Sequence, residues 1–321
     1  MSGAHRSSPA RILFVAANPS IDRLYEVERL AVGSIHRPGL VVARPGGKGL
    51  NAARAAACLG GSVTAIGIVA GRAGDWIVDR LAALGIDAPV VRSAGETRTC
   101  VSILDRSSGT LTEVYEQGET IEAAPWEALE LLVARELDRG DVGALAVSGS
   151  LPPGAPVDGY ARIARIAATW SVPVLADAYG PALAAVLGER PAIVKVNASE
   201  AANITGLAVD DDRSAVAAAR ALRERGAGAV VVTLGVAGAI AVETTAEVRL
   251  VPPDVRGAYP VGSGDAFLAG LAVAFVAGVP FVEAARRGMA AGIANALLPG
   301  AGDLDPAVAE RLADEVLVAP L

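Results

Sequence analysis

Apolar runs of strand length alternate along this chain with longer alanine-rich segments, and this alternation constrains the fold more than any other feature. Apolar strands separated by helices are typical of βαβ units, whose parallel sheet is covered by helices on both faces. We expect strands over residues 11–16, 63–69, 144–147, 172–176, 193–196 and 229–233, and a hairpin over 239–243 and 248–251. We expect helices over residues 51–59, 75–84, 126–137, 159–170, 213–225 and 265–277. The pattern predicts an α/β protein with a mostly parallel central sheet.

Two stretches interrupt this alternation, residues 22–45 and residues 91–115. In the second stretch, residues 97–104 and 110–115 alternate in polarity like the strands of a hairpin. We therefore expect a small separate β-sheet that forms a lid and is inserted into the core in these two segments. The α/β core would then consist of residues 10–21, 46–90 and 116–321.

Composition excludes several classes of protein. The chain has 321 residues, of which 52% are apolar, so it can bury a sizeable core. It carries 28 Lys and Arg against 35 Asp and Glu, a net charge of −7 with no basic run. Such a balance argues against a nucleic-acid or anionic membrane partner, and any anionic substrate would need a local positive patch.

Cysteine usage and hydropathy indicate the compartment. The two cysteines, Cys58 and Cys100, form neither a disulfide framework nor a metal-ligand cluster. The apolar run of residues 12–17 is too short for a signal-peptide core, and the uncharged stretch of residues 266–282 falls short of the ~20 residues that a spanning helix needs. We expect a cytoplasmic protein in a reducing environment.

Two glycine-rich segments each stand directly before an expected helix. In Pro45-Gly46-Gly47-Lys48-Gly49-Leu50-Asn51 the glycines let backbone amides approach an oxygen-rich ligand, although a tight strand-to-helix turn would use the same residues. In Pro260-Val261-Gly262-Ser263-Gly264-Asp265 several amides converge beside one carboxylate. The second segment predicts an anion hole with a base, unless Asp265 only complements the helix dipole.

Two further motifs follow expected strands, at residues 195–200 and 233–238. The carboxyl ends of parallel strands line the ligand crevice of open α/β sheets, so the four motifs indicate one shared site. Lys48 and Lys195 are the only lysines among the 28 basic residues, and both lie inside motifs. A compact ammonium group suits a phosphate met as a point charge, which favours a chemical role for both over chance.

The motifs of three other classes of enzyme are absent or incomplete in this chain. The chain has no P-loop sequence and no serine in a nucleophile elbow. Residues 47–52 match a dinucleotide-binding fingerprint, but the expected strand at 63–69 has no acidic residue at its end to hold a ribose. A nicotinamide-dependent dehydrogenase is therefore disfavoured.

Taken in order, the motifs resemble those of the ribokinase-like carbohydrate kinases of the PfkB family. The resemblance covers nearly the whole chain and is closest to tagatose-6-phosphate kinases, followed by 1-phosphofructokinases. It implies a three-layer αβα core with a small β-sheet lid. The segments that carry it are Asn18-Pro19-Ser20-Ile21-Asp22, Gly46-Gly47-Lys48-Gly49-Leu50-Asn51, Gly95-Glu96-Thr97-Arg98-Thr99-Cys100, Glu116-Gln117-Gly118, Ser148-Gly149-Ser150-Leu151-Pro152, Asn197-Ala198-Ser199-Glu200, residues 233–238 and Val261-Gly262-Ser263-Gly264-Asp265.

The resemblance also implies roles for the donor side of the site. Asp265 would take the proton of the accepting hydroxyl, while the amides of Gly262, Ser263 and Gly264 stabilise the transferred phosphoryl group. Asn197 and Glu200 would organise Mg²⁺ and the ATP phosphates, partly through water. The remaining residues expected to bind ATP are Lys195, Thr233, Gly235, Gly238 and again Gly264.

On the acceptor side, the resemblance assigns sugar hydroxyls to Asp22, Gly46, Gly47 and Asn51. Arg37, Lys48 and Arg98 are the candidates for a phosphate already present on the sugar, since a purely hydroxylic sugar would not require three cations.

We therefore expect an ATP- and magnesium-dependent kinase of a ketohexose monophosphate, either tagatose 6-phosphate or fructose 1-phosphate. The alternatives are a kinase of an unphosphorylated sugar or nucleoside, and a non-catalytic sugar-phosphate sensor on the same fold. An exposed face on the lid would also suit a homodimer.

Overall fold

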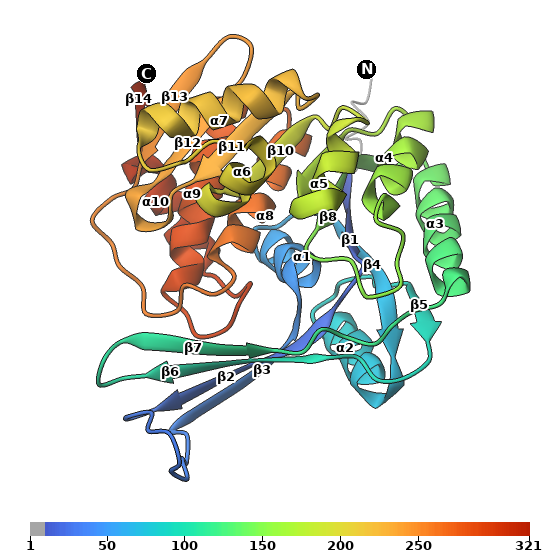
Figure 1. Ribbon diagram of the computed structural model, residues 1–321, viewed down its shortest axis with the longest axis vertical. Coiled ribbons are helices and arrows are strands. Elements are labelled where there is room, and N and C mark those ends of the chain that lie inside the picture. Colours follow the sequence, from blue (N-terminus) through green and yellow to red (C-terminus); the bar gives the residue numbers. More distant parts are fainter. Residues whose placement is uncertain (1–9) are drawn as a thin grey trace, which may run out of the picture.

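The computed structural model describes residues 10–321, which form a ten-stranded sheet with helices on both faces (Figure 1). The strand order is β14-β13-β12-β11-β10-β9-β8-β1-β4-β5. Every neighbouring pair from β11 to β5 is parallel, and β12, β13 and β14 extend the sheet in antiparallel fashion. The strands are β1 (Arg11–Ala16), β4 (Val63–Ala70), β5 (Val90–Ser93), β8 (Val142–Ser148), β9 (Val174–Asp177), β10 (Ile193–Asn197), β11 (Ala229–Thr233), β12 (Ala239–Val242), β13 (Glu247–Val251) and β14 (Leu317–Pro320).

The helices form two layers because successive side chains of each strand point to opposite faces of the sheet. In β1, Ile12 and Phe14 pack on one face, while Leu13 and Val15 pack on the other. The first face is covered by α1 (Lys48–Cys58), α2 (Gly71–Ala83), α8 (Ser263–Val276), α9 (Phe281–Ala296) and α10 (Pro306–Glu315). The second is covered by α3 (Ala123–Asp138), α4 (Gly159–Thr169), α5 (Gly180–Leu187), α6 (Ala198–Thr205) and α7 (Asp212–Glu224). The predicted three-layer α/β core is confirmed.

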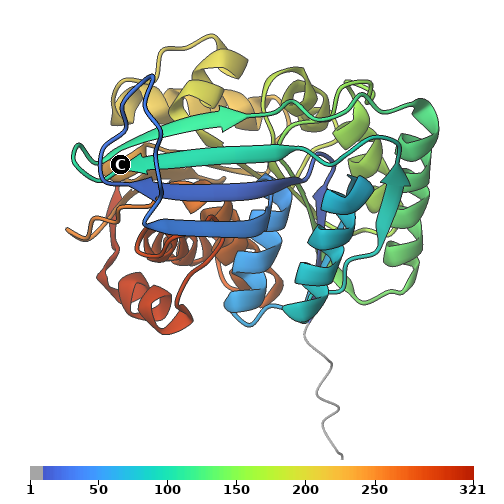
Figure 2. The same cartoon turned by 90° about the horizontal axis from the view of Figure 1, so that it is seen from below.

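The lid is a separate four-stranded sheet of order β3-β2-β6-β7, formed by β2 (Ser20–Val27), β3 (Leu40–Gly46), β6 (Thr99–Asp105) and β7 (Thr110–Tyr115). Figure 2 shows its strands lying side by side across the core. Leu24, Val42 and Leu104 pack with Tyr259 of the core, which fixes the inner face of the lid. Strand β3 leads directly through Gly47 into α1, so the base of the lid adjoins the first glycine motif.

The structure moves one boundary of the expected lid. The sequence pattern places residues 91–115 in the lid, but β5 pairs in parallel with β4 at the edge of the large sheet. This strand is short and only partly buried, so it lacks the continuous apolar run that marks the inner strands. The second lid segment begins instead at β6. With this new boundary, we propose the same division of the chain into an α/β core and a lid.

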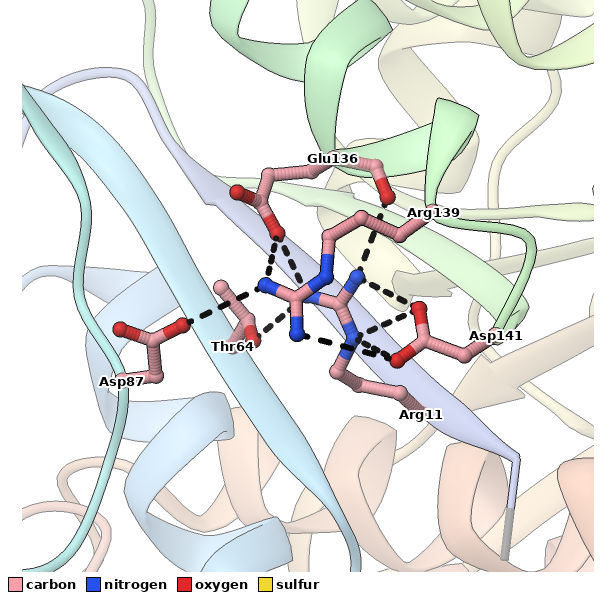
Figure 3. A network of polar contacts seen from close by, with 6 residues as sticks. All are labelled: Arg11, Thr64, Asp87, Glu136, Arg139 and Asp141. Carbon is pink, nitrogen blue, oxygen red and sulfur yellow. Dashed lines mark hydrogen bonds and ion pairs between the residues drawn. The ribbon is translucent and has the colours of Figure 1, made fainter. Parts of the chain in front are cut away.

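A buried polar cluster lies at the opposite end of β1 from the lid (Figure 3). Arg11, only 5% exposed, donates hydrogen bonds to Glu136 Oε2 and Thr64 Oγ1, each at 2.7 Å, and to Asp141 Oδ1 at 2.7 Å. Because this cluster joins α3, β1 and β4, its role is structural. Within residues 10–321, no helix is long and apolar enough to cross a membrane.

Candidate active site

A cleft of about 1050 Å³ opens between the lid and the carboxyl ends of the core strands. Strand ends and helix starts meet there, as expected for an open α/β sheet. Most of the residues singled out from the sequence line it, namely Asp22, Gly47, Lys48, Asn51, Arg98, Lys195, Asn197, Glu200, Thr233, Gly235, Gly238, Gly262, Ser263, Gly264 and Asp265. Motifs from distant parts of the chain therefore share one site.

Asp265 lies in the first turn of α8 and is buried at the bottom of this cleft. The side-chain amide of Asn51 donates to Asp265 Oδ2 at 3.0 Å and to Asp22 Oδ2 at 3.1 Å. Burial, reinforced by the negative charge of Asp177, raises the pKa of Asp265 to about 7, although Lys48 acts in the opposite direction. The carboxylate can therefore accept a proton near neutral pH.

The glycine turn, Gly262–Gly264, starts α8 and has a backbone that requires glycine. Gly262 has φ +83°, and a Cβ atom there would lie 2.7 Å from the Cα of Ala301. The first amides of a helix have no acceptor within the helix and can bind an anion. One of the expected donors is engaged, because the Ser263 amide donates to the Pro260 carbonyl at 3.1 Å.

Asp177 at the end of β9 joins the only two lysines of the chain. Lys195 Nζ lies 2.6 Å from Asp177 Oδ2, and Lys48 Nζ lies 3.2 Å from Asp177 Oδ1 and 3.0 Å from Glu200 Oε1. Burial alone would raise the pKa of Asp177, but the two ammonium groups hold it below its ordinary value. A Cβ atom at Gly264 would lie 3.3 Å from Lys195 Nζ, so this lysine stands directly behind the glycine turn.

Asp177 was not predicted from the sequence, since it matches none of the motifs. A signal was present, because Asp177 directly follows the strand expected at residues 172–176, and polar residues at such strand ends line ligand sites. The position of Lys48 also differs from its expected role. Its ammonium group lies between Asp177 and Glu200 rather than alone on the acceptor side.

Asn197 and Glu200 form a capping box at the start of α6. Asn197 Oδ1 accepts from the Glu200 amide, and Glu200 Oε2 accepts from the Asn197 amide, each at 2.9 Å. Among the described residues, no group of three or more His, Cys, Asp or Glu is arranged to hold a metal ion. A Mg²⁺ ion that also binds nucleotide phosphates needs only one or two carboxylates and several waters. The side-chain oxygens of Asn197 and Glu200, which both line the cleft, fit that requirement.

The nucleotide-side turn follows β11. Thr233 Oγ1 donates to the Val196 carbonyl at 3.4 Å, which ties this strand end to β10. Gly235 and Gly238 both have positive φ, and a Cβ atom at Gly238 would lie 2.3 Å from the Leu250 carbonyl oxygen. Glycine is required at Gly238 because β13 passes so closely.

The candidates for acceptor binding are placed differently from one another. Arg98 lines the cleft, and its guanidinium donates to the carbonyls of Asn18 at 2.9 Å and Glu116 at 3.0 Å. Gly46 lies beside the cleft, where a Cβ atom would overlap the carboxyl group of Asp22. Arg37 is exposed in the segment between β2 and β3 and does not line the cleft, contrary to expectation. The sequence provided no basis for the expected position of Arg37, because exposed charged residues are common and no sequence pattern specifies the direction of such a side chain.

Residues 15–307 match the pfkB family carbohydrate kinases. The chain is therefore a phosphotransferase, a carbohydrate kinase whose acceptor is an alcohol, as the resemblance of its motifs had implied. It belongs to the PfkB family, whose kinases use ATP.

Several solved structures share the fold. Phosphofructokinase-2 from Escherichia coli, solved in complex with fructose-6-phosphate, is 27% identical and covers 95% of this chain and 99% of its own, with a TM-score of 0.86. A possible 1-phosphofructokinase from Thermotoga maritima is 24% identical, with coverages of 97% and 99% and a TM-score of 0.89. Ribokinase from Arabidopsis thaliana, solved with ribose and ATP, is 21% identical, with coverages of 96% and 99% and a TM-score of 0.74. The ribokinase-like fold is thereby confirmed.

Proposed function

We propose that this protein transfers the γ-phosphoryl group of ATP to a ketohexose monophosphate, tagatose 6-phosphate or fructose 1-phosphate, and yields the bisphosphate. The observation that carries this proposal is the buried Asp265 beside the glycine turn, connected by Asn51 to Asp22 of the lid. A relative of known structure, phosphofructokinase-2 from Escherichia coli, was solved with a hexose monophosphate bound, which supports a phosphorylated acceptor.

In this proposal Asp265 Oδ2 or Oδ1 accepts the proton of the attacking hydroxyl, which a carboxylate with a pKa near neutrality can do at physiological pH. Asn51 keeps the carboxylate oriented, because one amide group bonds both Asp265 and Asp22. Lys195, behind the glycine turn, and the amides of Gly262 and Gly264 stabilise the charge on the transferred group. Phosphoryl transfer depends mainly on such positioning and charge stabilisation.

Mg²⁺ would be held by Asn197 and Glu200, partly through water, and would supply charge neutralisation at the ATP phosphates. Thr233, Gly235 and Gly238 would form the wall beside the nucleotide. On the acceptor side, Arg98 is the cation available to a sugar phosphate, while Asp22 and Asn51 bind hydroxyl groups.

One observation favours a second candidate, a kinase of an unphosphorylated sugar or nucleoside. Of the three residues proposed to bind the phosphate of the sugar, Arg37 lies outside the cleft and Lys48 is paired with Asp177 and Glu200. Arg98 then remains as the one of the three that lines the cleft without a carboxylate partner within residues 10–321. A non-catalytic sensor is disfavoured, because a protein that only binds needs no buried base beside an anion site.

The partner we propose is a second copy of this chain, bound through the outer face of the lid. Val41 and Val114 on the two edge strands are 54% and 60% exposed, and strand alternation places Val41 opposite the buried Val42. Phosphofructokinase-2 from Escherichia coli has been solved as a tetramer.

The test measures ADP release with ATP and Mg²⁺ over tagatose 6-phosphate, fructose 1-phosphate, fructose 6-phosphate, fructose, ribose and adenosine. Asp265→Asn serves as the blank, and we expect it to lower turnover at least about a hundredfold while ATP binding persists. Strong Asp265-dependent turnover on one of the first two compounds supports the proposal. Turnover on an unphosphorylated compound alone supports the second candidate function. The absence of turnover with all six compounds contradicts both candidate functions.

A further inference from the structure

The loop of residues 300–303, which follows α9, contacts two parts of the candidate site from behind. A Cβ atom at Gly262 would lie 2.7 Å from the Cα of Ala301, and a Cβ atom at Gly302 would lie 2.6 Å from the Asn51 carbonyl oxygen. The Gly302 amide donates to Asn295 Oδ1 at 2.7 Å, and Asn295 in turn donates to the Val261 carbonyl at 2.9 Å. Any shift of this loop would therefore move the glycine turn and the start of α1.

Asp303, the last residue of this loop, joins the lid to the core. Its Oδ2 accepts from Arg44 Nε at 2.7 Å, and its Oδ1 is paired with Arg54 Nη2. Arg44 belongs to lid strand β3, where it stands directly opposite Asp22 in the register of β2 and β3. Arg54 belongs to α1, one turn after Asn51. One carboxylate thus connects the base of the lid with the helix that carries Asn51.

The two halves of this link differ in what they contribute to stability. Arg54 is 2% exposed, donates to the carbonyls of Pro45 and Ala301, and needs a nearby carboxylate to offset the loss of water. The Arg44 side chain is 40% exposed, and ion pairs at that exposure contribute roughly 0–1 kcal/mol. The pair of Asp303 with Arg54 is therefore explained by its contribution to the stability of the fold. The pair of Asp303 with Arg44 contributes too little to stability to be explained in that way.

We infer that Asp303 is a positioning residue for phosphoryl transfer. Through its pair with Arg44, Asp303 couples the position of the lid to the geometry of the glycine turn. With the lid as the structure has it, Arg44 holds Asp303, and the 300–303 loop supports Gly262 and Asn51. With the lid displaced, the pair with Arg44 separates and this support weakens. The anion site and the base are then fully formed only when the lid covers the acceptor. The inference rests on the function proposed above.

The test compares Asp303→Asn, Arg44→Gln and the double variant with the parent protein. Asp303→Asn would keep an oxygen for Arg54 but remove the charge from both arginines, whereas Arg44→Gln leaves the pair of Asp303 with Arg54 intact and tests the lid contact alone. We expect kcat to fall roughly ten- to a hundredfold in each single variant, with the KM for ATP nearly unchanged, because small displacements of reacting groups have effects of that size. The double variant should lose no more than the worse single variant, since both changes remove the same link.

A matched control is Asp141→Asn, which removes a carboxylate from Arg11 at the other end of β1. It should lower the melting temperature and leave kcat unchanged. A loss of kcat in this control as large as that in Asp303→Asn would overturn the inference, because a general loss of stability would then explain both.

Amide hydrogen exchange provides a readout that needs no acceptor and no turnover. In Asp303→Asn and in Arg44→Gln, peptides over residues 260–266 and 300–304 should exchange at least about tenfold faster, as expected when a local opening becomes easier. A peptide over residues 193–197 should be unchanged, as should every one of these peptides in Asp141→Asn. Unchanged exchange at 260–266 in Arg44→Gln contradicts the inference even if no compound of the panel is a substrate, so its failure is distinct from that of the proposed function.

Discussion

Lys195 Nζ lies 2.6 Å from Asp177 Oδ2, and both side chains are almost fully buried at the carboxyl edge of the sheet. The other carboxylate oxygen of Asp177 faces Lys48, so both lysines of the chain meet on one acidic group. A buried carboxylate with two ammonium partners is well compensated. It also places a negative charge close enough to Asp265 to raise the pKa of that carboxyl group.

Replacement of Asp177 should therefore change the pH dependence of the reaction. In Asp177→Asn the pKa of Asp265 should fall, because the charge that disfavours its ionised form is gone. The acid limb of kcat/KM, near pH 7 in the parent, should move to lower pH even if kcat itself decreases. Profiles over roughly pH 5 to 9 cover the range in which this carboxyl group titrates. Glu200→Gln also removes a carboxylate from Lys48 and should move the limb less; an equal shift would remove the specific role of Asp177.

Asp265 should lower the stability of the folded protein at neutral pH. The pKa of Asp265 is about 7 in the folded state, against 3.8 for an unperturbed aspartate, so the folded state binds the proton more tightly. Its contribution to stability is complete below about pH 4 and is lost as the pH rises through 7. The amide of Asp265→Asn does not ionise, so the variant does not lose stability in this way as the pH rises. Its melting temperature should exceed that of the parent at about pH 8 and approach it at about pH 4.

Asp141→Asn provides the control of opposite sign. The hydrogen bond from Arg11 lowers the pKa of Asp141, so this carboxylate contributes stability above its unfolded pKa that is lost as the pH falls. The Asn variant should be destabilised more at about pH 7 than at about pH 3. As the pH rises from acid to neutral, the stability of Asp265→Asn relative to the parent should increase and that of Asp141→Asn should decrease. If both relative stabilities change in the same direction, the assigned pKa shift of Asp265 is contradicted.

Arg98 and Arg37 form a matched pair of arginines on the lid side. Arg98→Gln should raise the KM for a phosphorylated acceptor by about ten- to a hundredfold, since a hydrogen bond to a charged group contributes about 1.5–3 kcal/mol. The KM for ATP should change less than about threefold on the same reasoning. Arg37→Gln, outside the cleft, should leave both constants nearly unchanged. Steady-state kinetics on the active acceptor decide this, and equal effects of Arg98→Gln on both substrates would remove Arg98 from the acceptor site.

The polar cluster of Figure 3 should affect folding and not catalysis. Arg11→Met removes the buried partner of Glu136, which is only 5% exposed and keeps its pair with Arg139, so we expect a loss of at most about 3–5 kcal/mol of unfolding free energy. Urea unfolding measures it. Arg220→Met, which breaks an exposed pair with Glu247, should change the unfolding free energy far less. A loss in Arg11→Met as small as in the exposed pair would show that the cluster contributes little.

Local patterns predicted the core of the fold because they depend on spacing along the chain. A strand buried on both faces, such as β1, is apolar throughout, and that signal survives without knowledge of its neighbours. Strand β5 has only four residues and lies half-buried at a sheet edge, so its place in the core depends on pairing with β4. Helices α5, α6, α9 and α10 were not predicted. For α5 and α6, of eight residues each, the reason is that two turns of helix give little periodicity.

The amino-acid sequence by itself predicted the residues to which we assign the chemistry of this kinase, among them the glycine turn, Asp265 and the two lysines. These signals are local, since amide donors at a helix start and a carboxylate beside them lie within a few residues of each other. Only the tertiary structure decided which distant groups meet. It brought Asp177 between the lysines, set Asp303 between lid and core, and left Arg37 outside the cleft. Such contacts join residues far apart along the chain, where spacing carries no information about distance.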